Sequence, residues 1–284
     1  MGSEMCIRDR AGTFAVVYGI LYVANLIHPV LRFCLETFFI YQILATKSLK
    51  TESMKVYKKL KEGDLIGARK EVSYLVGRDT ENLDESEVAK ADVETIAENT
   101  ADGVIAPMLF IAIGGAPLGF AYKAVNTLDS MVAYKNEELI NIGFFSAKMD
   151  DICNFIPARF AAVMLMIASL ILRFDFKGAV KIFKRDRFAH LSPNSAQTEA
   201  VAAGALQIQL GGTHNYFGKA VVKPTIGDDI RPVEYEDIKR TNQLLYVSAV
   251  LSMAVCCLIT FLIYVQLFLS LIHISEPTRP LYIS

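Results

Sequence analysis

The feature that most constrains the fold is a run of 22 residues, Leu244 to Val265, without a single charged side chain. A membrane-spanning helix needs about 20 mostly apolar residues. Three more regions approach that length: residues 11–46, Gly103–Tyr122 and Phe155–Leu172. Apolar residues make up 53% of the chain, only slightly above the usual share, so their grouping into runs is the informative feature. We predict an all-α, polytopic integral membrane protein.

The apolar runs contain residues that break helices. Residues 11–46 contain His28-Pro29, which predicts either one long helix kinked at Pro29 or a span followed by an interfacial piece. Gly103–Tyr122 contains Pro107 and the sequence GGAP. The expected membrane regions are therefore 11–46, 103–172 and 244–265.

Two polar regions, 47–102 and 173–243, separate these runs. Their apolar residues recur at helical spacing, and Gly63-Asp64 is typical of a turn between two helices. Asp84 followed by Glu87 matches a capping box. The stretch LGGTHNYFGK indicates a glycine-rich loop, and no stretch alternates clearly enough to indicate a strand. We expect both regions to be sizeable helical loops.

The two ends of the chain differ from the rest. Residues 1–10, MGSEMCIRDR, and residues 266–284 resemble translated sequencing-adapter read-through. We expect both segments to be foreign to the natural protein, and we leave them out of the fold prediction.

Charge limits the partners and the topology. The net charge of −1 argues against a strongly basic nucleic-acid-binding protein. Residues 47–102 carry ten Lys or Arg and residues 173–243 carry eleven, against three in 123–154. The positive-inside rule then places both polar regions in the cytoplasm and 123–154 outside. Alternatively, Gly103–Tyr122 is a broken, re-entrant segment that lines a cavity.

Acidic residues gather at the start of that segment. Glu94, Glu98 and Asp102 recur every four residues and share one helical face, with Asn99 beside them. Acids on one face repel one another unless a cation lies there. The pattern indicates either a solvated helix end or a site for a divalent cation or a cationic substrate.

A second polar group follows the segment. Lys123, Asn126 and Asp129 share a face if this part is helical. Asp129 is a candidate metal ligand, and Lys123 and Lys135 are candidates to bind phosphate or carboxylate.

A third group precedes the next apolar run. Asp150, Asp151 and Asn154 have a spacing that would put their oxygens on one side of a helix, and Mg²⁺ prefers such ligands. Arg159 offers a fork for phosphate or carboxylate. The alternative is a capped helix with Arg159 reaching the membrane surface.

Two further stretches offer candidate contacts. Arg78 and Asp79 form either a local ion pair or a substrate contact. Ser192 and Asn194 lie in a predicted turn before a helix of small residues. Glu199 is explained either by capping of that helix or by a binding role.

Six blocks together carry a family resemblance: VGRDT, AENTADGVIAP, GGAPLGFAYKAVNTLDSMVAYKN, DDICNFIPAR, SPNSAQTEAVAAGAL and the LGG stretch. In this order and spacing, over residues 15–255, the chain resembles the adenosylcobinamide-phosphate synthase family of cobalamin biosynthesis. The resemblance implies a multi-pass inner-membrane enzyme that joins adenosylcobyric acid to an aminopropanol, or to its O-phosphate, through an amide bond at the expense of ATP. Members also begin with a membrane segment that we do not find here, because residues 27–33, IHPVLRF, correspond to a later segment. The chain therefore resembles an N-terminally truncated member.

The resemblance also implies roles for the candidate residues. The implied cofactors are ATP and Mg²⁺, and the implied partners are the corrinoid, the amine, membrane lipid and other membrane enzymes of the pathway. The expected metal ligands are Asp150, Asp151 and Asn154. The expected catalytic residues are Glu98, Asp102, Lys123, Asp129 and Arg159. The expected substrate-binding residues are Arg78, Asp79, Asn99, Asn126, Lys135, Ser192, Asn194 and Glu199.

Two other classes fit part of the pattern. A membrane prenyl or CDP-alcohol transferase that uses Mg²⁺ and diphosphate would also place an acidic block beside a span. A non-catalytic membrane sensor should lack the polar blocks, which this chain carries.

Overall fold

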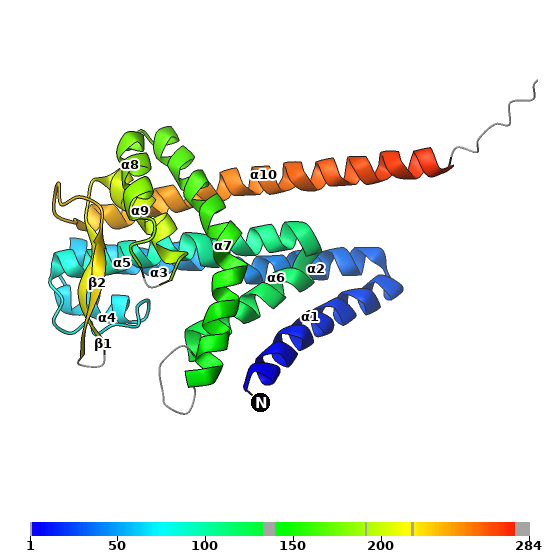
Figure 1. Cartoon of the computed structure of the whole chain (residues 1–284), viewed down its shortest axis with the longest axis horizontal. Coiled ribbons are helices and arrows are strands. Elements are labelled where there is room, and N and C mark those ends of the chain that lie inside the picture. The colour runs from blue at the N-terminus through cyan, green and yellow to red at the C-terminus, as the bar shows by residue number, and fades with distance from the viewer. Residues whose placement is uncertain (1, 133–139, 191, 217–218, 276–284) are drawn as a thin grey trace, which may run out of the picture.

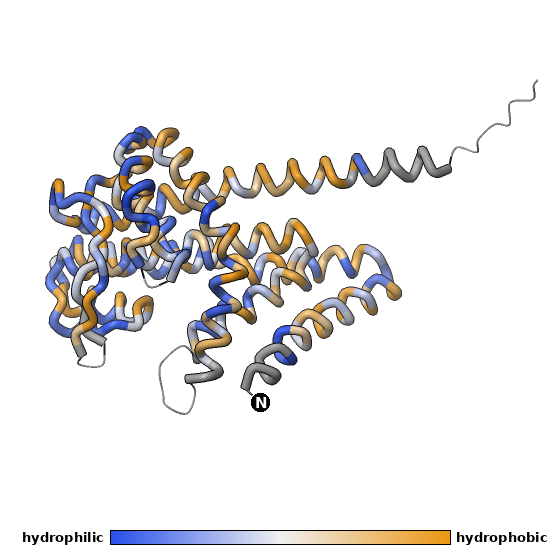
Figure 2. The backbone as a smooth tube through the Cα atoms, viewed as in Figure 1, coloured by the Kyte–Doolittle hydropathy of each residue, from blue (hydrophilic) through white to orange (hydrophobic). Residues whose placement is uncertain are grey.

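The computed structural model describes residues 2–132, 140–190, 192–216 and 219–275. Helices dominate, and they separate into a polar end and an apolar end (Figures 1 and 2). Four helices are long and apolar enough to cross a membrane: Arg8–Ile27, Glu85–Met131, Gly143–Ile171 and Tyr235–Ile263. Large apolar side chains on the last of these are exposed, including Phe261 at 64%. Exposed apolar surface of this kind suits lipid, and the predicted α-helical membrane fold is confirmed.

The first apolar region forms a helical hairpin. Helix α1 (Gly2–Ile27) packs against α2 (Pro29–Ile43), and the chain doubles back between them (Figure 1). His28 has extended backbone angles, and its Nδ1 accepts a hydrogen bond from Val30 N at 3.1 Å. The prediction of one long helix kinked at Pro29 is therefore wrong, because the extended residue before Pro29 reverses the chain. The alternative of a span followed by a second piece fits α1 and α2, since Arg8–Ile27 is long enough to cross a membrane.

Residues predicted to be foreign join this hairpin at one end. Buried Arg10 donates from Nη2 to Ser146 Oγ at 3.2 Å. Helix α10 (Tyr235–Ser275) includes part of the other predicted foreign segment, and residues 276–284 lie outside the described residues.

The segment Gly103–Tyr122 enters the apolar end and returns. Helix α5 (Glu85–Asn99) leads through a π-helical turn, η1 (Thr100–Ile105), into α6 (Ala106–Val132). Gly114 and Gly115 interrupt α6, with Gly115 at φ +66°, a conformation that costs glycine little. The chain reverses there (Figure 1), and Tyr122 Oη lies 3.0 Å from the carbonyl oxygen of Asp102. The geometry matches the broken, re-entrant alternative.

The two polar regions form one body at the other end of the molecule. It combines α3 (Thr46–Lys61), α4 (Leu65–Ser73), α5, α8 (Phe176–Asp186), α9 (Ser195–Leu206) and the start of α10 (Figure 1). Helix α7 (Ile140–Ile171) connects this body to the apolar end. The predicted turn at Gly63-Asp64 and the capping box are confirmed, with Asp84 Oδ1 accepting from Glu87 N at 2.8 Å.

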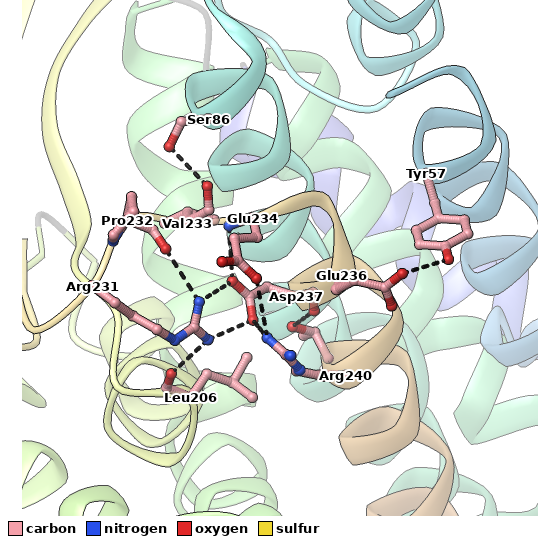
Figure 3. A network of polar contacts seen from close by, with 11 residues as sticks. Tyr57, Ser86, Leu206, Arg231, Pro232, Val233, Glu234, Glu236, Asp237 and Arg240 are labelled. Atoms are coloured by element: carbon pink, nitrogen blue, oxygen red, sulfur yellow. Dashed lines mark hydrogen bonds and ion pairs between the residues drawn. The ribbon is translucent and has the colours of Figure 1, made fainter. Parts of the chain in front are cut away.

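A buried ion pair fixes the start of α10. Arg231 donates to both oxygens of Asp237, at 2.8 and 2.6 Å, and to the carbonyl oxygen of Leu206 at 2.8 Å (Figure 3). Tyr57 Oη donates to Glu236 Oε1 at 2.8 Å, which ties α3 to the same end. Such bidentate contacts fix the relative orientation of the two side chains in addition to pairing their charges.

The predicted glycine-rich loop is instead a β-hairpin. Strands β1 (Leu210–Tyr216) and β2 (Lys219–Ile226) pair antiparallel, with a bulge between Gly211 and Thr213. Gly211 and Gly212 both have positive φ. The prediction of an entirely helical chain is wrong here, because glycines at a bulge and Pro224 in the second strand hide the alternation that marks a strand.

Helix α9 packs closely against α8 at Gly204. A Cβ atom there would lie 2.5 Å from the carbonyl oxygen of Gly178 on α8. We expect Gly204→Ala to lower the free energy of unfolding of the detergent-solubilised protein by about 1–3 kcal/mol, since two backbones must separate. Gly19→Ala is the control, because nothing lies within 4 Å of its Cβ position. Equal stability of both variants in a denaturation series would contradict this packing.

Candidate functional site

The three predicted polar groups meet at the base of the α6 hairpin. Helix α7 contacts both η1 and α6, and η1 contacts α6. The Tyr122 hydroxyl bridges two of these elements, since it lies 3.0 Å from the Asp102 carbonyl oxygen and 2.7 Å from Asn154 Oδ1. Residues that are about 50 positions apart in the sequence therefore surround one point. The re-entrant path of α6 is what brings them together.

Acidic side chains from four elements, α5, η1, α6 and α7, form a group that we call the carboxylate cluster. Its members are Glu98, Asp102, Asp129 and Asp150. Asp102 interacts electrostatically with the other three and with the ammonium group of Lys123. Four acids outnumber the one lysine among them, and like charges this close favour a bound cation or proton.

Hydrogen bonds orient one member of the cluster. Asp150 accepts from Asn154 Nδ2 at 3.0 Å and from Asn126 Nδ2 at 3.4 Å. Asn154 is buried, and its Oδ1 faces Tyr122, so both ends of its amide are engaged. Asn154 therefore positions Asp150 and has no free oxygen for a metal.

The cluster has oxygen ligands suited to Mg²⁺. Asp129 Oδ1 is buried without a hydrogen-bond partner among the described residues. Within the same described part of the chain, no three His, Cys, Asp or Glu side chains form a ready metal cage. Mg²⁺ is commonly held by one or two carboxylates together with substrate phosphates and water. The donor set therefore fits a magnesium ion that arrives with a phosphorylated substrate.

Asp151 acts electrostatically on Asp150 and Asp129, but it also contacts the 192–194 turn. Its Oδ1 accepts from Ser192 Oγ at 3.1 Å, and its backbone oxygen accepts from Asn194 Nδ2 at 2.9 Å. Neighbouring residues on a helix point about 100° apart. Asp150 and Asp151 therefore do not share one side of the helix, and Asp151 also holds the 192–194 turn. Its role as a metal ligand stays a prediction.

Arg159 lies at the same turn. Its Nη1 donates to Phe155 O at 2.5 Å and to Asn194 Oδ1 at 3.2 Å, and its guanidinium group stacks 3.6 Å from the Phe155 ring centroid. The turn therefore links a cationic side chain to the helix that carries Asp150.

The acidic side chains on one face of α5 make two separate sets of contacts. Ser195 Oγ donates to Glu98 Oε1 at 2.8 Å, whereas Glu94 accepts from Gly211 N and pairs with Arg78 at 2.7 Å. Arg78 therefore pairs with Glu94 on α5, a partner that neither predicted alternative named. Asp79 lines a cleft of about 370 Å³ beside the hairpin.

Asn99 and Lys135 are the remaining predicted residues of these blocks. Asn99 donates back to Thr95 O of its own helix at 2.9 Å. Lys135 lies outside the described residues.

Glu199 is buried at the same interface. It lies beyond the first turn of α9, so capping does not explain it. Burial raises the pKa of Glu199 well above its usual value, and the charges of Glu98 and Glu94 add to the effect, while Lys223 and Arg78 oppose it.

Some residues at the site could not be predicted from the sequence. Lys223 reaches Glu199 only because the chain forms the hairpin, and Arg10 acts on Asp129 from α1. His190, whose pKa burial lowers, accepts from Ser192 N at 3.1 Å. The sequence signals this last contact only by placing a histidine just before the Ser-Pro-Asn turn.

The raised pKa of Glu199 predicts how stability depends on pH. The folded protein binds this proton more tightly than the unfolded chain, so the stability that it contributes is complete below the unfolded pKa of about 4.3 and is lost as pH rises. Glu199→Gln removes the ionisation. We expect the variant to be more stable than the wild type at pH 8, with the difference vanishing near pH 4. Denaturation curves at both pH values test this, and a difference independent of pH would contradict it.

The arrangement can bind phosphate with a metal ion and can accept a proton from an ammonium group. Carboxylates supply metal ligands and a base, and Lys123 and Arg159 supply cations for phosphate or carboxylate.

Comparison with known proteins places the chain in one family. The family described as CobD/Cbib protein matches residues 5–245. A cobalamin biosynthesis protein CobD from Clostridium perfringens is 54% identical over 247 residues, which cover 87% of this chain and 78% of that protein. The corresponding protein of Streptococcus sanguinis is 54% identical over 230 residues, 81% of this chain and 73% of that protein.

A third relative and the solved structures complete the comparison. The cobalamin biosynthesis protein CbiB of Salmonella choleraesuis is 47% identical over 253 residues, 89% of this chain and 79% of that protein. No solved structure gives a significant match. The resemblance found in the six sequence blocks is thereby confirmed, and the chain belongs to the CobD/CbiB family.

Proposed function

We propose that this protein is an adenosylcobinamide-phosphate synthase of cobalamin biosynthesis. It joins adenosylcobyric acid to 1-amino-2-propanol, or to its O-phosphate, through an amide bond formed with ATP. The relatives carry the name cobalamin biosynthesis protein at about half identity over most of the chain. The four long apolar helices support a membrane location, and we assign the protein to the cell inner membrane.

The observation that carries the proposal is the convergence of Glu98, Asp102, Asp129 and Asp150 beside Lys123. A free carboxylate does not react with an amine until its oxygen is converted into a leaving group. ATP does this when the corrinoid carboxylate oxygen attacks the γ-phosphorus and ADP leaves, which forms an acyl phosphate. The amine nitrogen then attacks the acyl carbon, and inorganic phosphate leaves as the amide forms. Both steps develop negative charge that cations must stabilise.

The residues of the chain suit separate parts of this reaction. Asp129 and Asp150 would hold Mg²⁺, which neutralises phosphate charge when bound. Lys123 and Arg159 would bind phosphate or carboxylate oxygens. Glu98 or Asp102 would accept the proton that the amine must lose before it attacks. Asn126 and Asn154 orient Asp150 through the hydrogen bonds described above.

An isotope experiment tests the proposed activation. The detergent-solubilised protein is incubated with adenosylcobyric acid labelled with ¹⁸O in its free carboxylate, ATP, Mg²⁺ and the phosphorylated amine. We expect one ¹⁸O atom in inorganic phosphate for each amide formed. Label in AMP would show that the activated intermediate is an acyl adenylate and not an acyl phosphate. Amide formation without ATP would contradict the proposal.

The same preparation tests the transferase alternative. Incubation with a prenyl diphosphate and Mg²⁺, without ATP, should give no product. Turnover under those conditions would favour a membrane prenyl transferase over the amide ligase.

A further inference from the structure

Two arginines from different helices lie at the turn that borders the carboxylate cluster. Arg159 reaches the turn from α7 through Asn194. Arg187, at the end of α8, is held there by Gln197, whose Nε2 donates to the backbone oxygens of Arg187 at 2.9 Å and Pro193 at 3.0 Å. Arg187 is also the charged group that acts on Arg159, with the same sign. Asn194 and Gln197 therefore place both arginines beside the 192–194 turn, although their like charges repel each other.

Neither arginine has a carboxylate partner among the described residues. Arg185, two residues before Arg187, pairs with Asp186 and Asp228, and Arg231 pairs with Asp237. No such ion pair involves Arg159 or Arg187 within the described part of the chain. Arg185 and Arg231 thus have carboxylate partners, whereas Arg159 and Arg187 have none among the described residues.

The guanidinium group of Arg187 is partly buried with an unsatisfied donor. Its Nε has no hydrogen-bond partner among the described residues and no contact with solvent. The Phe183 and Phe188 rings lie 5.4 and 4.8 Å from the group, and Phe155 supports Arg159 in the same way. Aromatic faces hold the guanidinium planes and leave the N–H edges to bind an acceptor. A buried N–H without an acceptor is costly, so the geometry favours an anion.

We propose that Arg159 and Arg187 form a subsite for a phosphate group, with Arg187 as a binding residue that sequence inspection did not identify. Arginine forks match the oxygens of a phosphate dianion in two-point contacts. The assignment of this phosphate to a substrate rests on the proposed function.

The position of the subsite indicates which substrate carries the phosphate. The Arg159 guanidinium group lies at the level of Phe155 along α7, because it bonds to that residue's carbonyl oxygen. Five residues separate this level from Asp150, about 7.5 Å along the helix axis. The subsite therefore borders the carboxylate cluster, and a short molecule with its phosphate in the subsite can extend its amine towards Glu98 and Asp102, the proposed bases. We therefore assign the subsite to the phosphate of the phosphorylated amino alcohol, and the terminal phosphate of ATP is the competing source.

Binding of inorganic phosphate tests the subsite without catalysis. The thermal unfolding temperature of the full chain in detergent is measured against phosphate at constant ionic strength, for the wild type, Arg187→Gln and Lys184→Gln. Lys184 is the matched control, because it is an exposed cation on the same helix. We expect phosphate to stabilise the wild type and Lys184→Gln equally, and Arg187→Gln to bind it at least about tenfold more weakly. Equal binding by all three proteins would overturn the subsite.

Kinetics then identify the source of the phosphate. Arg187→Gln should raise KM at least about tenfold for the phosphorylated amine and leave KM for the unphosphorylated amine and for ATP unchanged. If only the KM for ATP rises, the phosphate subsite stands, and the phosphate that it binds belongs to the nucleotide. If no KM changes although phosphate binding is lost, the subsite serves neither substrate and the assignment fails. Arg187→Lys keeps the charge and replaces Arg187→Gln if that variant does not fold.

These outcomes separate the subsite from the proposed function. If phosphate binding depends on Arg187 but the protein forms no amide with any amine, the subsite is supported and the ligase activity is rejected. Phosphate binding that appears only in vesicles containing anionic lipid would assign the arginines to lipid headgroups and overturn the proposal.

Discussion

Asp150→Asn is expected to lower kcat for amide formation by about 100- to 1000-fold, whereas Asp151→Asn should lower it by only about tenfold. The two residues are adjacent and the two changes are chemically identical. Asn154 and Asn126 hold Asp150 inside the carboxylate cluster, whereas Asp151, which also acts on Asp129, turns one oxygen to Ser192 at the rim. The difference between the variants therefore measures whether the chemistry takes place at the cluster.

The measurement is the steady-state rate at saturating ATP, corrinoid and amine, over a series of Mg²⁺ concentrations. The unfolding temperatures of both variants are recorded, so that loss of fold is not mistaken for loss of chemistry. If Asp150→Asn turns over near the wild-type rate at limiting Mg²⁺, Asp150 has no metal role. A larger loss for Asp151→Asn would move the site to the 192–194 turn.

Arg78→Met is expected to lower the free energy of unfolding by about 3–5 kcal/mol, because it leaves the Glu94 carboxylate buried without its cation. The side chains of Arg78 and Glu94 are only 6% and 15% exposed, and they lie 2.7 Å apart. Glu94 also accepts from Gly211 N at 2.7 Å, so the ion pair fixes the base of the β-hairpin against α5.

A double variant separates this structural role from substrate binding. Arg78→Met with Glu94→Leu removes both charges, and such paired replacement is often close to neutral. We expect it to regain most of the stability that the single variant loses in a urea denaturation series. If both variants are as stable as the wild type and yet lose affinity for substrate, Arg78 is a substrate contact and the structural account is wrong.

The parts of the fold that depend on near neighbours could be predicted from the sequence. The capping box at Asp84 and Glu87 and the turn at Gly63 follow from residues within a few positions of one another. The spans follow from composition over about 20 residues. These signals are local, and the structure confirms the capping box and the turn.

The parts that depend on distant contacts could not be predicted in this way. The reversal at Gly114 and Gly115 places Tyr122 against Asp102, and only this contact shows that the acids before and after the segment share one site. The separate directions of Asp150 and Asp151 follow from helix geometry, but the partner of Asp151 lies 41 residues away. The β-hairpin could not be predicted because its glycines and proline interrupt the alternation of apolar and polar residues that marks a strand.

The central claim is that three separated segments form one magnesium site that holds ATP. Fe²⁺ substituted for Mg²⁺, with ascorbate and peroxide, cleaves a protein backbone close to the bound metal, and the fragments are mapped by mass spectrometry. With ATP present, the account predicts cleavage near Glu98–Asp102, near Asn126–Asp129 and near Asp150, all suppressed by excess Mg²⁺. Cleavage confined to one of these segments, or unaffected by Mg²⁺, would contradict it.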